Sequence, residues 1–480
     1  MKPARELLAE VLSSLAGASL RYADIRHTVT HQQHVRVRNG EVDHLSSTVD
    51  HAVGVRVLVG DGWGFAASSD TSPGAVRATA RRAIEVAAAS NIASTQRVVL
   101  SDVEPYDATW SSTYRVDPWS VPIERKIDHL MNATEAMRGD ARIHQVSGEI
   151  SSYRQEKTFA STEGSFIEQT TTQMGGGIEA VAIAGSEFQR RTYPNPFGGD
   201  YQAEGWEFID RLDLARKGLQ VRDEALALLA APKSPAGRFD LIVGSSQLAL
   251  QVHESCGHPT ELDRAMGLEI SLAGGSFLQP SMLGNFRYGS DLVNIVADAT
   301  LAGSIGSFAY DDDGVRAQRF PLVERGMFVG YLTGRDTAPA IGRTSNGTVR
   351  AESAARIPII RMTNINLEPG ATTLDELIAD TKRGIFVDTN KSWSIDDVRL
   401  NFQFGCEVAY EIEKGRLGQL LRNPVYTGST PEFWRSCDAI ADRSTWQVWG
   451  LPNCGKGDPM QTMRVAHGAP AARFRAIEMH

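Results

Sequence analysis

The segment His253-Glu254-Ser255-Cys256-Gly257-His258 constrains the fold of this 480-residue chain more than any other feature. It places two imidazoles and a carboxylate within six residues, at the end of a predicted amphipathic helix. These are the groups of a hydrolytic zinc site, because neutral nitrogens hold the metal and a glutamate takes a proton from bound water. Any fold that uses this site has to bring both histidines to one point.

The spacing of the two histidines predicts an irregular helix. Residues five apart on an α-helix point about 140° apart around its axis, whereas residues four apart share a face. His253 and His258 can therefore reach one ion only if the helix widens into a π-turn or ends between them. Gly257 gives the backbone freedom at this point, and Pro259 pushes His258 away from helical geometry.

The residues before the motif predict a rigid support for it. The apolar run 239–243 reads as a buried strand, and Gly244 turns the chain. Ser245 or Ser246 can then cap a helix with apolar residues between 248 and 252. A strand that leads into a capped helix holds the side chains at the end of that helix firmly.

A catalytic zinc site needs a third protein ligand and keeps its fourth position for water. The residues that could supply this ligand are Glu261, Asp263, Glu269, His467 and Cys454. Cys454 is the best candidate on chemistry, because its Gly-rich loop permits a close approach and Lys456 favours the thiolate.

The chain is long enough for two or more domains, since single hydrophobic cores rarely grow beyond about 250–300 residues. Helices and strands are predicted in blocks without regular β-α-β alternation, which is typical of an α+β fold of mostly antiparallel sheets with packed helices. The segment 231–235 contains two prolines and reads as a linker. We therefore expect an N-terminal α+β domain over 1–232 and a strand-rich domain over 233–480, with the zinc site in the C-terminal half.

The main expected elements follow from hydrophobic periodicity and turn residues. Helices are expected over about 3–16, 72–90, 121–138 and 206–229. Strands are expected over 24–30, 35–38, 53–59 and 63–67, in the region 143–192, and over 326–332, 359–367, 384–387 and 402–412. Asn39-Gly40 is a strong signal for a hairpin turn.

Charge and composition argue against several classes of partner. A net charge of −9 gives no general attraction to nucleic acid or anionic membranes. No stretch approaches the roughly 20 apolar residues of a transmembrane helix, and Glu6 and Glu10 interrupt any signal-peptide core. Four cysteines without a secretion signal indicate reduced thiols, so we expect a cytoplasmic protein.

Three other segments have structural rather than catalytic interpretations. Asp311-Asp312-Asp313-Gly314 could bind a hard cation but is more typical of a turn. Gly175-Gly176-Gly177 lacks the Lys-Ser/Thr of a phosphate loop and indicates a strand irregularity or a close backbone approach. Cys256 has no acyl-transfer partners in the sequence, so it is expected to be a packed thiol or to support the metal ligands.

Several further segments match one known family when they are taken together with the motif. They are Asn39-Gly40, Gly54-Val55-Arg56-Val57, Gly62-Trp63-Gly64-Phe65, Tyr310-Asp311-Asp312-Asp313-Gly314, Arg361-Met362-Thr363-Asn364 and Asn453-Cys454-Gly455-Lys456. With these segments the chain resembles the TldD/PmbA family (peptidase U62, "modulator of DNA gyrase") over about residues 22–474, and its TldD branch in particular. Many members carry a Gly-rich segment where this chain has residues 390–395, so substrate-binding residues are not assigned.

The resemblance implies a zinc-dependent peptidase and assigns the site. It implies that His253, His258 and Cys454 hold zinc and that Glu254 is catalytic. It also implies an unfolded peptide substrate that binds as an extended strand, and a TldE/PmbA-like paralogue as partner in a heterodimer, with self-association as an alternative. In that mechanism Glu254 takes the proton of the metal-bound water and returns it to the leaving amine.

Two other functions stay open on the sequence alone. The first is a non-catalytic, zinc-containing modulator or binding protein. Glu254 speaks against it, because a purely structural zinc site does not require a neighbouring glutamate. The second is a zinc hydrolase of non-peptide amides, which only the family resemblance separates from a peptidase.

Overall fold

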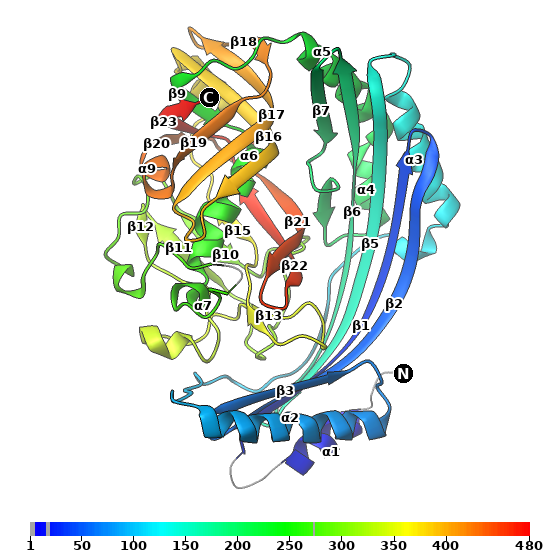
Figure 1. The fold of residues 1–480 in the computed structure, drawn as a ribbon, viewed down its shortest axis with the longest axis vertical. Coiled ribbons are helices and arrows are strands. Elements are labelled where there is room, and N and C mark those ends of the chain that lie inside the picture. The colour runs from blue at the N-terminus through cyan, green and yellow to red at the C-terminus, as the bar shows by residue number, and fades with distance from the viewer. Residues whose placement is uncertain (1–4, 16–19, 272–273) are drawn as a thin grey trace.

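A single long sheet organises the first half of the chain. The structure, a computed structural model, describes residues 5–15, 20–271 and 274–480. The sheet has eight strands in the order β3-β2-β1-β5-β6-β4, with β7 and β8 also paired to β6. Four of its strands are 19 residues long and curve along the molecule (Figure 1). The strands are β1 Leu20–Arg38, β2 Glu41–Val59, β3 Gly62–Ser68, β4 Asp107–Ser111, β5 Ile143–Ser161, β6 Phe166–Ala184, β7 Glu187–Tyr193 and β8 Asp200–Gln202.

Helices cover this sheet in two places. The helices α3 (Ile123–Ala136), α4 (Trp206–Leu212) and α5 (Leu214–Ala230) lie on the side away from the second half of the chain (Figure 1). The helices α1 (Arg5–Leu15) and α2 (Pro73–Ala93) pack at the end near β3. The expected helices are confirmed, although both ends of the one expected over 3–16 extend outside the described residues.

The helix expected over 206–229 is divided in two. Asp213 separates α4 from α5 with a left-handed backbone, φ 49°. Its carboxylate accepts a hydrogen bond from Arg216 in the first turn of α5. The hydrophobic periodicity on both sides of this break is helical, so the sequence pattern alone did not reveal it.

The long hairpin of β1 and β2 turns at Asn39-Gly40 as expected. Its first strand is continuous, however, where the sequence predicted two short strands separated by polar residues. The polar segment 30–34 stays in the sheet because β2 and β5 pair with it on both sides. Thr30 and Gln32 line a cavity of about 620 Å³ between the sheet and the second half of the chain. On the other face of the strand Gln33 accepts a hydrogen bond from Lys126, so polar residues lie on both faces and apolar periodicity is absent there.

The second half of the chain is built from smaller sheets around the motif helix. A seven-stranded sheet has the order β16-β9-β23-β19-β17-β18, with β20 beside β23. Its strands are β9 Gly237–Val243, β16 Arg383–Ile395, β17 Asn401–Glu413, β18 Arg416–Leu421, β19 Val425–Ser429, β20 Cys437–Ile440 and β23 Ala472–Met479. The short helix α9 (Thr430–Arg435) connects β19 with β20, and α8 (Leu374–Ala379) leads into β16.

Three further sheets complete this half. The first contains β10 Ile295–Asp298, β11 Arg319–Glu324, β12 Met327–Phe328 and β15 Ile365–Leu367. The second pairs β13 Val349–Arg350 with β14 Ile359–Ile360, and the third pairs β21 Gln447–Lys456 with β22 Gln461–Ala469. Among the described strands, the ladders β4–β6 and β9–β16 are parallel and the others antiparallel, which confirms the expected α+β class.

The strand expected over 326–332 is shorter than predicted. It ends at Phe328, and the chain then approaches β11 so closely that a Cβ on Gly330 would lie 2.3 Å from the Pro321 carbonyl oxygen. Leu332 instead donates its backbone N–H to the carbonyl oxygen of Thr260, at 2.8 Å. A tertiary contact with the motif region thus replaces the expected sheet ladder.

Buried charges connect the long sheet with the second half of the chain. Arg56 on β2 lies 2.7 Å from Asp24 and 2.6 Å from Asp313. Lys157 on β5 lies 2.6 Å from Asp312. Asp311 accepts backbone N–H bonds from Asp313 and Val315, each of 2.9 Å, which confirms the turn interpretation of this acidic segment.

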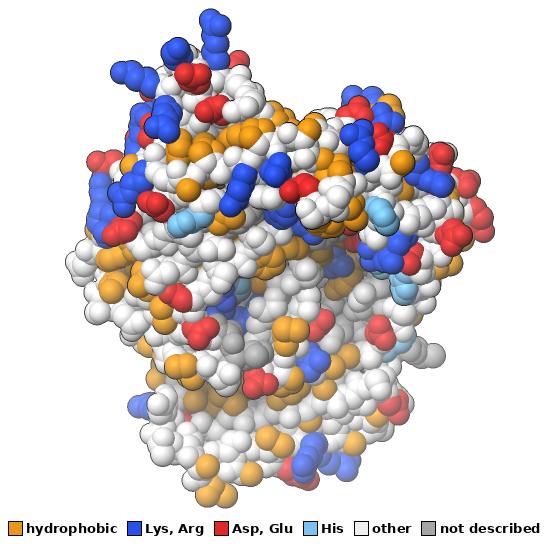
Figure 2. All heavy atoms as spheres, turned by 45° about the horizontal axis from the view of Figure 1, so that its top comes forward, with side chains coloured by type: hydrophobic (Ala, Val, Ile, Leu, Met, Phe, Trp, Pro, Cys, Tyr) orange, Lys and Arg blue, Asp and Glu red, His pale blue; other side chains and the backbone are white. Residues whose placement is uncertain are grey.

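On the face shown in Figure 2, acidic and basic side chains are interspersed. In residues 5–15, 20–271 and 274–480, no helix is long and apolar enough to cross a membrane.

Candidate metal centre

The motif lies at the end of the helix α6 (Ser245–Val252), in which every residue after Ser245 is buried. The strand β9 leads into it through Gly244, as expected from the sequence. The prediction of a serine cap is wrong, because the hydroxyls of Ser245 and Ser246 bond to Ala469 and Asn195 instead. The carboxylate of Asp388 accepts the N–H of Gln247 at 3.2 Å and thus satisfies the start of the helix.

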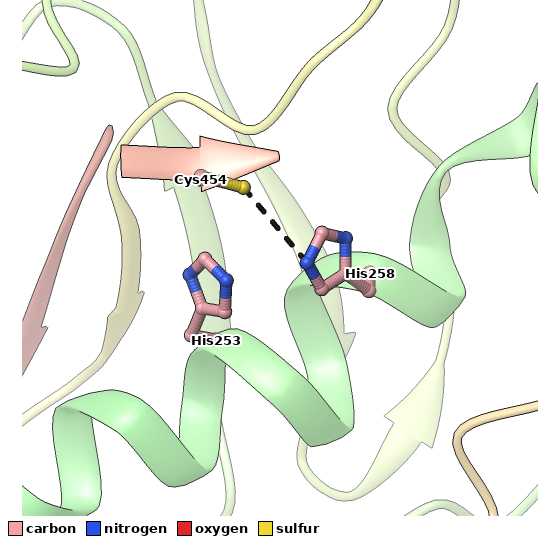
Figure 3. Close-up of side chains that lie close together, drawn as sticks. All are labelled: His253, His258 and Cys454. Atoms are coloured by element: carbon pink, nitrogen blue, oxygen red, sulfur yellow. Dashed lines mark hydrogen bonds between the residues drawn. The ribbon is translucent and has the colours of Figure 1, made fainter. Parts of the chain in front are cut away.

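The helix widens into a π-turn over His253–Gly257, as the spacing of the two histidines predicts. The N–H of His258 donates to the carbonyl oxygen of His253, five residues earlier. A short 3₁₀ segment follows over His258–Thr260. As a result the two imidazoles lie on the same side of the helix, with ring centroids 4.8 Å apart (Figure 3).

Buried hydrogen bonds hold the π-turn in place. The Tyr288 hydroxyl donates to the Ser255 carbonyl oxygen at 2.8 Å, and the Trp434 indole donates to the Ser255 hydroxyl at 2.9 Å. Thr260 donates to the Cys256 carbonyl oxygen at 2.9 Å. A Cβ on Gly257 would lie 2.1 Å from the sulfur of Met362, so glycine is required by the close approach. Widening a helix frees carbonyl groups, and these side chains satisfy them.

Cys454 completes a group of three possible metal donors. One donor atom each of His253, His258 and Cys454 lies within 4.8 Å of the others, and all three residues are buried. Cys454 comes from β21, just after an irregularity in its pairing with β22, and points towards the motif helix (Figure 3). Its sulfur lies 3.8 Å from Nε2 of His258. The structure thus brings together the three residues that the family resemblance assigned to the metal.

The charge that favours the Cys454 thiolate comes from Arg361, not from Lys456. Burial alone raises the pKa of Cys454, but the positive charge of Arg361 and the bond with His258 outweigh it, so the pKa lies below the ordinary value. Arg361 donates to the carbonyl oxygen of Cys454. Lys456 instead lies 2.8 Å from both carboxylate oxygens of Asp263, which corrects the role expected for it.

His467, one of the alternative ligands, supports His253 from behind. Its Nε2 lies 2.7 Å from Nδ1 of His253, and its Nδ1 lies 3.2 Å from the carbonyl oxygen of Ile365. A carbonyl oxygen only accepts, so Nδ1 of His467 donates to it and Nε2 accepts from His253. This chain of bonds leaves the Nε2 lone pair of His253 free for a metal.

Glu261 orients His258 in the same manner. Its carboxylate lies 3.0 Å from Nδ1 of His258, so Nε2 faces the site. Although burial raises the pKa of Glu261, the charge of Lys456 and the hydrogen bond from His258 hold it well below its usual range. The remaining candidates, Asp263 and Glu269, do not belong to the three-donor group.

Burial keeps both ligand imidazoles in the neutral form that binds metals. It lowers the pKa of His253 to about 4 and also lowers the pKa of His258. Cys256 differs, because burial raises the pKa of its thiol to about 12. Cys256 is a packed thiol, as expected, and a thiol with a raised pKa is a poor nucleophile.

Glu254 occupies the first position after His253 in the π-turn and forms an ion pair. Its Oε2 lies 2.6 Å from Nη1 of Arg399, and its side chain is 6% exposed. The sequence analysis named Glu254 but not Arg399. The two residues are 145 positions apart in the chain, so no local pattern indicates their contact.

The residues present fit a zinc ion. Two neutral imidazoles and a cysteine of low pKa are donors that zinc favours, and three protein ligands leave one position for water or substrate. Each imidazole also has a partner on its other nitrogen, which is typical of metal-ligating histidines. The arrangement can activate a water molecule beside a carboxylate.

Comparison with known protein families agrees with this chemistry. Models of the PmbA/TldA metallopeptidase match three parts of the chain: domain 1 matches residues 23–87, the central domain 116–229 and the C-terminal domain 236–480. The chain belongs to the PmbA/TldD family. It is accordingly a metallopeptidase, and the resemblance stated from the sequence is confirmed.

Two metalloprotease relatives align with nearly the whole chain, and a third aligns with just over half of it. A metalloprotease of Methanocaldococcus jannaschii is 31% identical over 454 residues, which cover 94% of this chain and 95% of that protein. A metalloprotease TldD homologue of Haemophilus influenzae is 27% identical over 98% of this chain and 95% of its own length. A zinc metalloprotease TldD homologue of Saccharolobus solfataricus is 25% identical over 56% of this chain and 58% of its own.

Solved structures show the same fold at lower identity. A Thermotoga maritima protein described as a modulator of DNA gyrase has a TM-score of 0.77 at 17% identity, and the alignment covers 99% of each chain. TldE from Thermococcus kodakarensis has a TM-score of 0.73 at 17% identity, again over 99% of each chain. The PmbA/TldD fold therefore extends over the full length of this protein.

Proposed function

We propose that this metallopeptidase hydrolyses peptide bonds with zinc held by His253, His258 and Cys454. The observation that supports this most directly is the convergence of the three donors from two distant segments, each imidazole with its second nitrogen occupied. Zinc bound there supplies a Lewis acid that lowers the pKa of a water molecule and polarises the scissile carbonyl. The name of the S. solfataricus relative also includes zinc.

Glu254 acts as the general base in this proposal. It follows His253 directly, so its carboxylate comes from the same π-turn as the ligands. It accepts the proton of the attacking water and delivers it to the nitrogen of the leaving amine. A purely structural zinc site has no use for a buried carboxylate in this position.

The burial of the site supports an extended, unfolded substrate. His253, Glu254, His258 and Cys454 are each between 3% and 5% exposed. A peptide bond on the surface of a folded protein cannot reach atoms this deep, whereas an extended chain can enter. Backbone hydrogen bonds along a strand then hold the peptide, with little dependence on side chains.

We further propose that the chain is the catalytic subunit of a complex with a TldE/PmbA-like chain. The structural match with TldE shows that the same fold occurs in a protein of that name. A second subunit that covers the entrance would admit extended peptides and exclude folded proteins. Self-association of this chain is the alternative arrangement.

The decisive experiment is Glu254→Ala with an unstructured peptide as substrate. The variant should keep its zinc and its fold but lose about 10²–10⁴-fold in turnover, the usual contribution of a general base. Unchanged turnover would falsify the proposed mechanism and favour a non-catalytic, zinc-containing modulator. Hydrolysis of small non-peptide amides in preference to peptides would instead assign the site to an amide hydrolase.

A further inference from the structure

Arg399, which contacts Glu254, lies in an unusual backbone conformation. It belongs to the turn between β16 and β17, and its φ is 67°, in the left-handed region that few residues other than glycine and asparagine adopt. Asp396 builds this turn, because its carboxylate accepts the N–H of Leu400 at 2.7 Å and the N–H of Asn401 at 3.0 Å. A hairpin turn by itself requires no arginine in the left-handed position.

Contacts from two other segments hold the turn in this conformation. The N–H of Phe277 donates to the carbonyl oxygen of Val398 at 2.8 Å. The hydroxyl of Thr430 donates to the carbonyl oxygen of Arg399 itself, also at 2.8 Å. The surrounding structure therefore imposes the left-handed geometry and fixes the direction of the Arg399 side chain. Backbone strain that is maintained in this way is characteristic of functional sites.

The side chain of Arg399 is directed at the proposed general base. Its Nη1 donates to Oε2 of Glu254 at 2.6 Å, a charge-assisted hydrogen bond. The two side chains are 18% and 6% exposed, so solvent screens the pair weakly. In the described part of the chain, Nε of Arg399 has no hydrogen-bond partner. Among the described residues, the bond to Glu254 is thus the polar contact that accounts for the burial of the guanidinium.

We propose that Arg399 is the positioning residue of Glu254, an inference that rests on the proposed peptidase function. The terminal torsion of a glutamate has a broad energy minimum, so a carboxylate next to a metal needs a partner to fix its orientation. Arg399 holds Oε2 and leaves Oε1 to receive the proton from water. General-base catalysis depends on hydrogen-bond reach to that proton, so loss of Arg399 slows the chemical step.

The test compares three single variants of the full-length chain. Arg399→Asn removes the guanidinium and suits the left-handed backbone, so it should not disturb the turn. Arg399→Lys retains a positive charge. Val398→Ala changes the adjacent residue of the same turn, whose side chain is 40% exposed, and serves as the matched control. Each variant is assayed for kcat and KM on one unstructured peptide, for zinc content and for the zinc dissociation constant.

Arg399→Asn is expected to lower kcat by about 10- to 100-fold, less than the ~10²–10⁴-fold of a lost general base. KM and the zinc dissociation constant should change by less than about three-fold, because neither substrate contacts nor ligands are removed. Arg399→Lys should recover part of kcat, and Val398→Ala should match the unmodified protein. A crystal structure of Arg399→Asn should show the Glu254 carboxylate turned away from its present position.

Three results would overturn the proposal. The first is an unchanged kcat in Arg399→Asn while Glu254→Ala is inactive; the peptidase function then stands and only the role of Arg399 is wrong. The second is a rise in KM alone, which would make Arg399 a substrate-binding residue. The third is the absence of zinc-dependent cleavage by the unmodified protein, which removes the proposed function and this inference together.

Discussion

Nδ1 of His253 lies 2.7 Å from Nε2 of His467, and this contact fixes which nitrogen of His253 faces the metal site. His467 is itself anchored to the carbonyl oxygen of Ile365. It comes from β22, the strand that pairs with the strand of Cys454. One hairpin therefore supplies both a thiolate and the support for an imidazole on the motif helix.

His467→Phe should weaken zinc binding by about 10- to 100-fold, as for other residues that support metal ligands. The phenyl ring fills the space but leaves Nδ1 of His253 without an acceptor. Competition with a chelator measures the zinc dissociation constant. The control is His144→Phe, at an exposed position of β5, which should bind zinc as the unmodified protein does. Equal affinity of the two variants would show that His467 does not support the site.

Cys454→Ala should lose most of the zinc, because it removes one of the three donors. Cys256→Ala is the matched control, since this thiol is equally buried and lies between the two histidines in sequence, but its pKa is raised. Elemental analysis of both variants decides the assignment. If Cys454→Ala keeps its full zinc content while Glu269→Gln or Glu261→Gln loses it, the third ligand is a carboxylate instead.

Tyr288→Phe should loosen the π-turn. It leaves the Ser255 carbonyl oxygen buried without its donor, which costs about 1–3 kcal/mol. We expect a lower free energy of unfolding and weaker zinc binding, because His258 depends on the π-turn for its position. Denaturant unfolding and chelator competition measure the two effects. Tyr114→Phe, at an exposed tyrosine, provides the control. A stability loss with unchanged zinc affinity would show that the ligand geometry does not need this bond.

Arg56→Met should destabilise the protein by about 3–5 kcal/mol, because it leaves Asp24 and Asp313 as buried carboxylates without their shared partner. The exposed pair of Arg82 and Glu85 offers a comparison, and Arg82→Met should change stability by less than about 0.5 kcal/mol. Equilibrium unfolding of both variants tests the difference. Equal small effects would mean that the buried charges contribute little to joining the two halves.

The isolated chain should cleave unstructured peptides slowly and gain activity when a TldE/PmbA-like chain without the motif is added. The physical reason is that a covered entrance holds an extended peptide against a buried site. A tightly folded protein should stay intact at any ratio of the two chains. The measurement is the rate of peptide cleavage as the second chain is titrated. Full activity of this chain alone, or equal cleavage of folded and unfolded forms of one protein, argues against the complex.

The sequence alone determined the features that depend on local spacing and turn chemistry. A separation of five positions from His253 to His258 already requires a π-turn or a helix end, because helical periodicity places such residues far apart around the axis. Asn39-Gly40 already determines the hairpin turn, since both residues tolerate a positive φ. The sequence pattern did not reveal that polar residues 30–34 continue a strand, because Thr30 and Gln32 face a cavity lined by distant segments and Gln33 binds Lys126 on the other side.

Tertiary structure alone decided which charged groups meet. Lys456 is close to Cys454 in sequence, yet its ammonium binds Asp263, because a buried ammonium is stabilised most by a carboxylate in direct contact. Arg361 therefore supplies the charge beside the thiolate, and Arg399 reaches Glu254 from the distant turn between β16 and β17. Motif spacing determines which metal donors are available. The partners of those donors depend on packing between segments that are far apart in the chain. Sequence periodicity describes only local structure, so it does not encode that packing.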